Sequence, residues 1–165
     1  MKPALLVIDI QKAFFAQTPE AGPSLRQAVP VVNGAISLFR EKHLPVICIQ
    51  HINPLTGVTP ETEGFALPDD LAITSTDMHI HKRYGNAFNK TDLEQVLREQ
   101  GVDTLILTGY CAEFCVLSTY RGALDRDLTP ILLKGGLASR NPGNIPFVEN
   151  ISELITLGTL KQLLS

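Results

Sequence analysis

The sequence predicts an α/β protein in which helices cover both faces of a mostly parallel β-sheet. Apolar runs rich in β-branched residues recur along the chain, and they lack the alternating polar positions of a half-exposed strand. Segments with a helical spacing of apolar residues lie between these runs. The 165 residues, 44% of them hydrophobic and 19% charged, suffice for one well-buried core. We therefore expect a single domain over residues 1–165.

The expected strands follow the apolar runs at residues 4–10, 45–50, 102–108 and 129–133. The first and third runs are the most continuously apolar, which predicts that they form the centre of the sheet. His79 and His81 alternate along a further strand and share one of its faces, while Lys82 points to the opposite face. The last segment, residues 153–165, fits a short strand and a closing helix.

Three helices are expected between the strands. Residues 30–42 carry an apolar stripe and begin with a proline, which suits the first turn of a helix. Thr91 and Glu94 are spaced as in a capping box, and Gly101 is expected to end the helix that follows. The third helix is expected over residues 115–125.

The carboxyl ends of parallel strands meet at one edge of the sheet, and ligands bind at that edge in open α/β folds. Four parts of the chain fall at or just beyond the ends of predicted strands: Asp9, His51, Lys82 and residues 109–115. We expect them to converge. Residues 53–75, with several threonines, prolines and glycines, are expected to form a loop over the sheet.

The charge pattern favours a small-molecule partner. The net charge is −3 and no run of basic residues is present, which argues against nucleic acid and membrane surfaces as partners. Asp9 interrupts the N-terminal apolar run too early for an export segment. The three cysteines, an odd number, fit a reducing compartment better than a disulfide framework. These observations predict a cytoplasmic location.

One cysteine has the setting of a nucleophile. Cys115 lies in the stretch from Gly109 to Val116, where a buried strand is expected to turn into a helix. The first free N–H groups of a helix stabilise a thiolate, so with Lys82 as a companion cation we expect the pKa of Cys115 to lie below the free-thiol value of about 8.5. Asp9 and Lys82 would complete a nucleophilic set of acidic base, cation and thiol. The alternative for such a cysteine is a buried position on a core helix.

These residues carry a resemblance to a known superfamily. The chain resembles the isochorismatase-like cysteine hydrolases, which include nicotinamidases and ureidoacrylate-type amidohydrolases. The resemblance rests on Asp9-x-Gln11-x-x-Phe14, on the segment from Lys82 to Phe88, and on Gly109 through Cys115 to Thr119, and it runs nearly end to end. It implies a three-layer α/β/α domain with a Rossmann-like six-stranded sheet. It also implies a homo-oligomer, either a dimer or a tetramer.

The resemblance assigns a role to each member of the set. Asp9 corresponds to the general base, Lys82 to the cation between acid and thiol, and Cys115 to the nucleophile. Backbone N–H groups at Cys111 and Cys115 correspond to the oxyanion hole, with a cis peptide matching Tyr110–Cys111. We therefore expect a hydrolase that cleaves the C–N bond of a small amide or ureido compound through a thioester.

The expected enzyme uses no metal and no cofactor. Nicotinamidases carry an Asp-x-His metal pair after the second strand, and His51 and Asn53 occupy those two places here. His51 is instead expected to orient substrate. Aromatic residues near the motifs are expected to line the pocket, although core packing competes for at least half of them: Phe14, Tyr84, Phe88, Tyr110 and Phe114.

The other two cysteines are expected to be structural. Cys48 falls on a core strand and Cys111 behind the oxyanion turn. A metal or redox pair of Cys111 with Cys115 is disfavoured, because three residues separate the two thiols rather than the usual two.

The sequence also departs from the family pattern and leaves other functions open. Ala112-Glu113 replaces the usual Thr-Asp, and Gly135-Gly136 replaces the usual Asp-Ala, which concerns the local turns and substrate binding. The first alternative function is the vinyl-ether hydrolysis of true isochorismatases, which lack the cysteine nucleophile. The second is a catalytically idle or thiol-sensing protein that keeps the scaffold.

Overall fold

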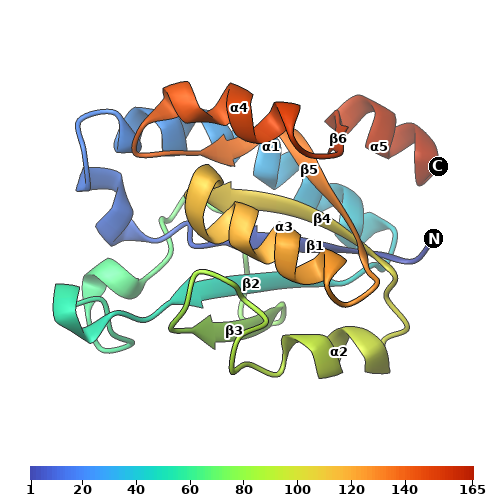
Figure 1. Cartoon of the computed structure of the whole chain (residues 1–165), viewed down its shortest axis with the longest axis horizontal. Coiled ribbons are helices and arrows are strands. Elements are labelled where there is room, and N and C mark those ends of the chain that lie inside the picture. The colour runs from blue at the N-terminus through green and yellow to red at the C-terminus, as the bar shows by residue number, and fades with distance from the viewer.

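Six short segments pair side by side in one parallel sheet. The computed structural model describes all residues from Met1 to Ser165. The strands are β1 (Pro3–Ile8), β2 (Val46–His51), β3 (Met78–Lys82), β4 (Thr104–Tyr110), β5 (Thr129–Ala138) and β6 (Leu154–Ile155). Their order across the sheet is β3-β2-β1-β4-β5-β6, and every neighbouring pair is parallel (Figure 1). All residues of β1 and β4 are buried, which confirms these strands as the centre of the sheet.

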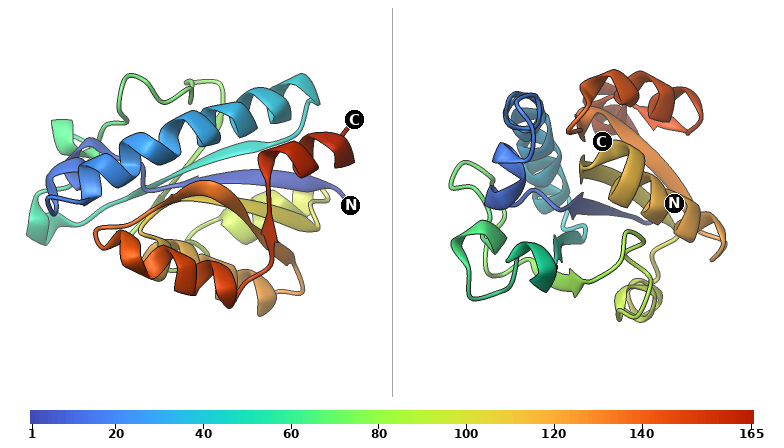
Figure 2. Two further views of the ribbon diagram at one scale, coloured as in Figure 1. Left: turned by 90° about the horizontal axis from the view of Figure 1, so that it is seen from above. Right: turned by 60° about the vertical axis from the view of Figure 1, so that its left-hand side comes forward.

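Helices cover both faces of this sheet, so the molecule has three layers (Figure 2). The helix α1 (Ala21–Glu41) packs on one face together with α5 (Leu157–Leu163). The helices α2 (Leu93–Glu99), α3 (Leu117–Leu124) and α4 (Ile145–Asn150) pack on the other face. Each face buries its own cluster of 20 core residues, which explains why the strands read as continuous apolar runs. The predicted three-layer α/β/α fold is confirmed.

Several element boundaries differ from those that the sequence predicts. The first helix begins at Ala21 rather than at residue 30, and Pro30 lies inside it. Apolar residues before Pro30 continue the buried stripe, and the 21-residue helix tolerates the one lost N–H because its length is packed on the sheet. The strand β5 extends five residues past the predicted end to Ala138, and α4 was not foreseen.

The capping box predicted at Thr91 is wrong. The helix α2 begins at Leu93, and the Thr91 hydroxyl accepts a hydrogen bond from the Leu93 N–H at 3.3 Å. Glu94 does not reach back to the helix start, because its carboxylate binds Arg98 and Arg126 instead. The long segment after β2 is a loop as expected, interrupted by 3₁₀ turns at Pro54–Thr56 and Glu63–Phe65.

The chain after β4 is also built differently from the expected helix start. Residues Ala112–Val116 form one π-helical turn, and α3 follows only from Leu117. Gly109, just before this turn, has φ +116°, and a Cβ there would lie 2.0 Å from the carbonyl oxygen of Ile8. Only glycine therefore allows β4 to end so close to β1.

None of the α-helices combines the length and the apolar character that crossing a membrane requires.

Candidate active site

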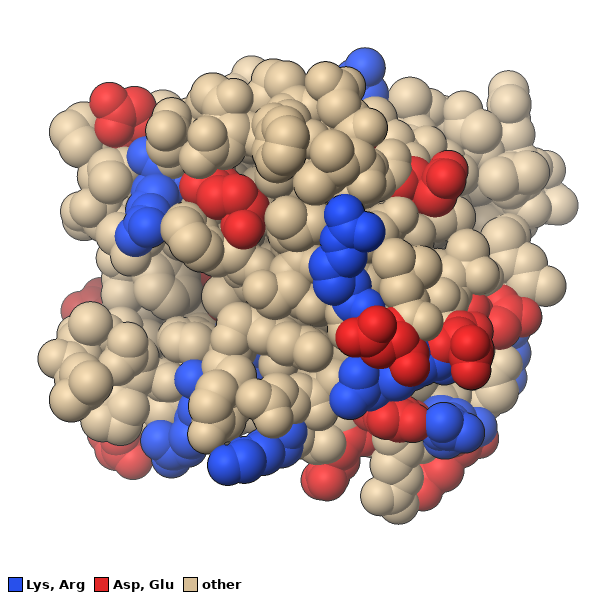
Figure 3. All heavy atoms as spheres, in the orientation of Figure 1, with Lys and Arg blue, Asp and Glu red and all other residues tan.

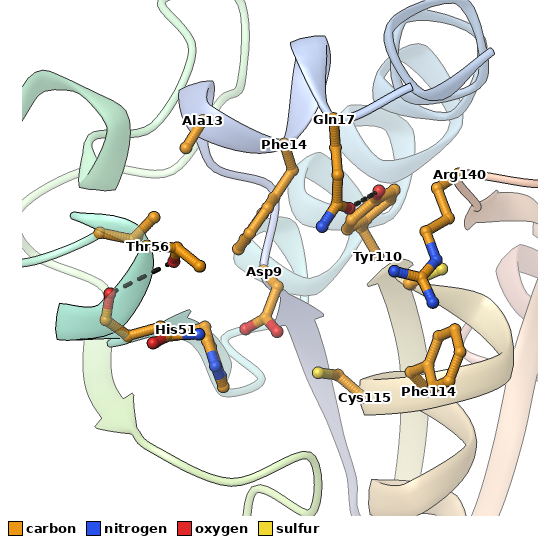
Figure 4. A pocket seen from close by; sticks show the side chains of 13 residues that line it. Asp9, Ala13, Phe14, Gln17, His51, Thr56, Tyr110, Phe114, Cys115 and Arg140 are labelled. Carbon is orange, nitrogen blue, oxygen red and sulfur yellow. Dashed lines mark hydrogen bonds between the residues drawn. The ribbon is translucent and has the colours of Figure 1, made fainter. Parts of the chain in front are cut away.

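Four polar side chains converge where four neighbouring strands end. Asp9 follows β1, His51 ends β2, Lys82 ends β3, and Cys115 belongs to the π-helical turn after β4. Because these strands are parallel, their carboxyl ends lie at the same edge of the sheet. Figure 4 shows Asp9 and Cys115 pointing toward each other, with His51 on the side of Asp9 away from the π-helical turn. The structure thus brings the predicted triad together.

Lys82 is the centre of the group. Its side chain is fully buried, and its Nζ donates to Asp9 Oδ2 at 2.9 Å and to Cys115 Sγ at 3.3 Å. The same nitrogen contacts His51 Nδ1 at 2.8 Å and the Tyr84 carbonyl oxygen at 3.0 Å. An ammonium has three protons, so four acceptors compete for them, and the thiol at the longest distance is bound most weakly. Lys82 therefore links acid and thiol, as the sequence predicts.

The Asp9 carboxylate has one oxygen free to take a proton. Oδ2 accepts from Lys82, whereas Oδ1 is buried and has no hydrogen-bond partner. Asp9 has a left-handed backbone with φ 52°, a conformation that is sparsely populated outside glycine and often occurs at functional sites. Ligand atoms of Asp9, His51 and Cys115 all lie within 4.8 Å of one another. Oδ1 is therefore an available acceptor for the Cys115 proton.

The predicted lowering of the Cys115 pKa is wrong. Burial, followed by the negative charge of Asp9, raises the pKa of Cys115 to about 12, and the opposing effect of Lys82 is smaller. Cys115 is the fourth residue of the π-helical turn rather than its first, so it does not receive the exposed N–H groups of a helix start. The resting site therefore pairs a neutral thiol with a carboxylate, and deprotonation must accompany attack.

His51 is neutral in this environment. Burial and the charge of Lys82 lower its pKa, while Asp9 acts in the opposite direction. The backbone of His51 is held on both sides by the fully buried side chain of Gln11. Gln11 Oε1 accepts from the His51 N–H at 2.7 Å, and Gln11 Nε2 donates to the His51 carbonyl at 3.0 Å. The motif residue Gln11 thus fixes the end of β2 against the chain that follows β1.

The peptide bond Tyr110–Cys111 is cis, as the resemblance implies. The N–H of Cys111 donates no hydrogen bond to any group of the protein.

Glu113, one of the two departures from the family pattern in this turn, accepts from the Ser139 hydroxyl at 2.8 and 2.7 Å and from Asn144 Nδ2 at 3.2 Å. Ser139, which is buried just after β5, also contacts Cys111 Sγ at 3.5 Å. This departure therefore supplies hydrogen bonds that fix the turn.

A cavity of about 420 Å³ opens over these groups. Phe14 and Tyr110 stack with their ring centroids 5.3 Å apart, and the Tyr110 hydroxyl donates to Gln17. The Arg140 guanidinium lies over the Phe114 ring at 4.5 Å and makes no ion pair. The lining residues are Asp9, Ala13, Phe14, Gln17, His51, Asn53, Thr56, Val58, Tyr110, Cys111, Phe114, Cys115 and Arg140 (Figure 4).

Two of the aromatic residues predicted to line the pocket do not. Phe88 is buried in the core on the α2 and α3 face, where the Arg126 guanidinium covers its ring at 4.7 Å. Tyr84 is 42% exposed and its ring lies beside Lys90, so only its backbone carbonyl serves the site. Both residues belong to the motif segment that begins with Lys82 at the end of β3. The chain after Lys82 turns away from the cavity, so their side chains do not line it.

The remaining histidines and Cys48 lie outside the site. His79 and His81 are exposed on β3, with His79 Nε2 bonded to the Thr74 carbonyl and His81 against the Phe65 ring. Because residues alternate between the two faces of a strand, His79 and His81 lie on the exposed face of β3 and Lys82 lies on the buried face. Cys48 is buried on β2, where burial raises its pKa to about 12. Unlike Cys115, this thiol has no hydrogen-bonded acidic or basic partner that could take its proton, so we expect it to be unreactive.

The donor set around Lys82 does not fit a resident metal ion. Asp9, His51 and Cys115 could each offer one ligand atom, and these atoms are close enough together for one ion. The Lys82 ammonium already contacts all three, at 2.8 to 3.3 Å. A metal cation bound by the same atoms would meet this positive charge at short range in a buried place. An ion held by these three residues would therefore lie close to the buried ammonium, which disfavours its binding.

Sequence reasoning missed the polar residues at the rim of the cavity. Arg140 lies two residues after the end of β5, so a correct prediction of that strand would have placed it at the same sheet edge as Asp9 and Lys82. Gln17 follows the first motif by three residues, and nothing in its spacing marks it. Ala13, Thr56 and Val58 carry no chemical signal that sequence alone would reveal.

Comparison with known proteins gives consistent matches. The family model described as Isochorismatase domain matches residues 3–147. The isochorismatase family protein YddQ of Bacillus subtilis (strain 168) is 33% identical over 128 residues, which cover 76% of this chain and 71% of that protein. An isochorismatase-like hydrolase from Alkaliphilus metalliredigens superposes with a TM-score of 0.90 at 26% identity over 100% of both chains. N-carbamoylsarcosine amidase from Thermoplasma acidophilum gives a TM-score of 0.81 at 27% identity, covering 95% of this chain and 97% of that one.

Proposed function

The chain belongs to the isochorismatase family of hydrolases, and from this premise we propose that it is a metal-independent cysteine hydrolase of small amide or ureido compounds. One observation carries the proposal: a single buried ammonium binds both a carboxylate and a thiol at the floor of the cavity. A general base, a nucleophile and a cation at hydrogen-bond distance form a complete set for nucleophilic catalysis.

In the first half of the reaction, Cys115 Sγ attacks the carbonyl carbon while Asp9 Oδ1 takes the thiol proton. The raised pKa of Cys115 makes this transfer necessary, and the unpartnered Oδ1 is placed to receive it. Backbone N–H groups of Cys111 and Cys115 stabilise the oxyanion, which suits the unbonded N–H of Cys111. Asp9 then gives the proton to the departing nitrogen, the C–N bond breaks, and a thioester remains on Cys115.

In the second half, water takes the place of the departed amine or ammonia. Asp9 removes a proton from the water as its oxygen attacks the thioester carbon, and the tetrahedral intermediate releases Cys115 Sγ. The proton on Asp9 returns to the sulfur, and the product leaves as a carboxylic or carbamic acid. Lys82 keeps its proton throughout and offsets the negative charge that moves between Asp9 and Cys115.

The cavity favours substrates with a negatively charged group. Arg140 is the one Lys or Arg side chain that lines it, and no acidic residue pairs with this guanidinium. The name of the solved relative, N-carbamoylsarcosine amidase, describes a substrate with a ureido group and a carboxylate. An N-carbamoyl amino acid would present the first group to Cys115 and the second to Arg140, which binds carboxylates in a bidentate manner.

The test is release of ammonia from a panel of small carboxamides and N-carbamoyl amino acids. Mass spectrometry of the acid-quenched enzyme should find an acyl adduct on Cys115, and treatment with a metal chelator should leave the rate unchanged. Arg140→Gln should raise KM for the carboxylated substrates about tenfold or more and leave that for neutral amides unaffected. Loss of turnover on chelation, restored by zinc, would contradict the metal-free mechanism.

Assaying isochorismate beside this panel distinguishes the alternative functions. A vinyl-ether hydrolase would act on isochorismate and would tolerate Cys115→Ala, because that chemistry needs no nucleophilic thiol. A protein that alkylates at Cys115 but turns over none of these compounds would be catalytically idle. The proximity of Cys115 to both Asp9 and Lys82 favours the amide hydrolase.

A further inference from the structure

His51 is held at every polar group except one. Gln11 binds both its backbone N–H and its carbonyl oxygen, at 2.7 and 3.0 Å. Lys82 Nζ approaches its ring nitrogen Nδ1 at 2.8 Å. The second ring nitrogen, Nε2, has no hydrogen-bond partner in the protein, although the residue lines the cavity. A ring that is bound at one nitrogen and carried on a hydrogen-bonded backbone presents its other nitrogen in a defined direction.

The contact with Lys82 decides which ring nitrogen carries the proton. An ammonium has only protons to offer, so Nδ1 must be the acceptor and must be unprotonated. A neutral imidazole then carries its hydrogen on Nε2. The burial and the positive charge around the ring disfavour a second proton, and the charged groups that face it are Lys82 and Asp9. His51 is therefore a hydrogen-bond donor toward the cavity and is no acceptor there.

The position of His51 in the sheet indicates which part of a bound molecule its Nε2–H would contact. β2 and β4 flank β1 on opposite sides, so His51 and the turn at Cys111 lie on opposite sides of Asp9. A molecule that reacts with Cys115 thus has backbone donors on one side and the His51 ring on the other. We propose that His51 is a fixed neutral donor whose Nε2–H binds an acceptor atom of the molecule that reacts with Cys115.

This inference deepens the proposed function, on which it rests for the identity of the reacting molecule. It assigns His51 a substrate-orienting role at a place where the nicotinamidase pattern has a metal ligand. It also narrows the substrate class to amide or ureido compounds that carry a hydrogen-bond acceptor on the Asp9 side of the reacting carbon.

Two substitutions separate the two ring nitrogens. The side-chain oxygen of His51→Asn reaches the position of Nδ1 and can still accept from Lys82, but no donor reaches the position of Nε2. His51→Gln places an amide donor at the position of Nε2 and loses the acceptor near Lys82. A donor role therefore predicts that Gln is tolerated and Asn is not, and a role limited to holding Lys82 predicts the opposite.

Alkylation of Cys115 provides the measurement without a known substrate. The probes are iodoacetamide, which has a carboxamide acceptor, and methyl iodide, which has none, with rates divided by those of a free thiol. We expect His51→Asn to lower the preference for iodoacetamide about tenfold and His51→Gln to keep it within about threefold of the parent protein. An unchanged preference in His51→Asn, or an equal loss in both variants, would overturn the proposal.

The tautomer can be read in the unsubstituted protein, so misfolding of a variant cannot obscure the result. Nitrogen NMR of protein with ¹⁵N-labelled histidine should show His51 with Nε2 protonated and Nδ1 unprotonated at neutral pH. A proton on Nδ1, on either the neutral ring or an imidazolium, would overturn the proposal. Neither experiment requires turnover, so a failed amide panel with both of these results intact would reject only the proposed function.

Discussion

Two groups of charged residues in this molecule have the same chemistry and opposite surroundings. Asp9 and Lys82 form an ion pair whose side chains are 2% and 0% exposed. Glu94 on α2 binds Arg98 and Arg126, and the exposed fractions of these three side chains are 37%, 72% and 27%. Acidic and basic side chains lie next to one another over α2, at the lower right of Figure 3. The first pair lies at the carboxyl ends of a central strand, β1, and an edge strand, β3. The second network joins the surface of one helix to the chain after α3.

The two groups differ in the desolvation that they require and in the stability that they contribute. Burying two charges requires their desolvation, and the mutual attraction offsets this only when further hydrogen bonds satisfy the remaining protons. Lys82 has such partners in His51 and the Tyr84 carbonyl. The exposed network needs little desolvation and contributes correspondingly little. A buried pair of this kind is explained better by the chemistry of the neighbouring thiol than by stability.

The largest effect is expected from removing that thiol. Cys115→Ala should lower turnover by about 10⁴-fold or more, because the nucleophile and its base act as one unit. The melting temperature should stay close to that of the parent protein, since the Asp9–Lys82 pair remains and alanine suits a helical turn. Enzyme assay and thermal melts check the two parts.

Cys48→Ala is the matched control for that variant. It removes buried volume from β2 at a residue that does not line the cavity, so it should lower the free energy of unfolding by about 1 kcal/mol and spare turnover. In the parent protein, iodoacetamide should label Cys115 before Cys48 or Cys111. Faster labelling of either other thiol would refute the nucleophile assignment.

The next largest effect concerns the buried pair itself. Lys82→Met leaves the Asp9 carboxylate buried without a partner and should lower the free energy of unfolding by about 3–5 kcal/mol, besides abolishing turnover. The double variant Asp9→Asn with Lys82→Met removes both charges and should recover most of that stability without recovering activity. Denaturant unfolding curves measure both values. If Lys82→Met were as stable as the parent protein, the buried pair and the exposed network would not differ in the stability lost when one partner is removed.

The sequence predicted the central position and the burial of β1 and β4, because apolar, unalternating runs need cover on both faces. It also predicted the triad, since Asp9 and Lys82 each follow or end a strand of the parallel sheet. It failed on the Cys115 pKa, because burial and the charge of Asp9 outweigh the effect of Lys82. It also did not foresee that the chain after β4 forms a π-helical turn in place of a helix start. Local residue types carry no signal for that choice.

The lining of the cavity was predictable only in part. Phe14, Tyr110 and Phe114 lie close to motif residues in both sequence and space. Tyr84 and Phe88 follow Lys82 by two and six residues, yet the chain after β3 directs Tyr84 to the surface and Phe88 to the core. Such directions depend on how a loop packs, whereas strand ends follow from topology.

A smaller effect is expected on the stability of the folded protein at alkaline pH. Burial raises the pKa of Cys115 to about 12, above the value of about 8.5 in the unfolded chain. The unfolded state therefore loses this proton first, so stability is retained below about pH 8.5 and declines as the pH rises toward the folded pKa. Cys115→Ala should lose less stability than the parent between about pH 9 and pH 11.

Thermal melts across this range measure the difference. Cys48, whose pKa burial also raises to about 12, remains in the variant, so part of the decline should persist. Identical declines in the parent and in Cys115→Ala would mean that Cys115 is not protonated in the folded protein at these pH values.

The smallest effect is expected from the exposed network. Glu94→Gln keeps the size of the side chain and removes its charge, and the melting temperature at neutral pH should change by no more than the scatter between replicate melts, because solvent and salt screen these pairs. Arg98 and Arg126 lower the pKa of Glu94 below its ordinary value, so whatever stability the carboxylate contributes is present above the unfolded pKa and is lost as the pH falls through the folded pKa. Any difference between Glu94→Gln and the parent should therefore appear above the unfolded pKa, shrink as the solution is acidified, and shrink also on addition of salt. A destabilisation as large as that of Lys82→Met would show that exposure does not separate the two groups of charges, and the argument that the buried pair is kept for chemistry would lose its basis.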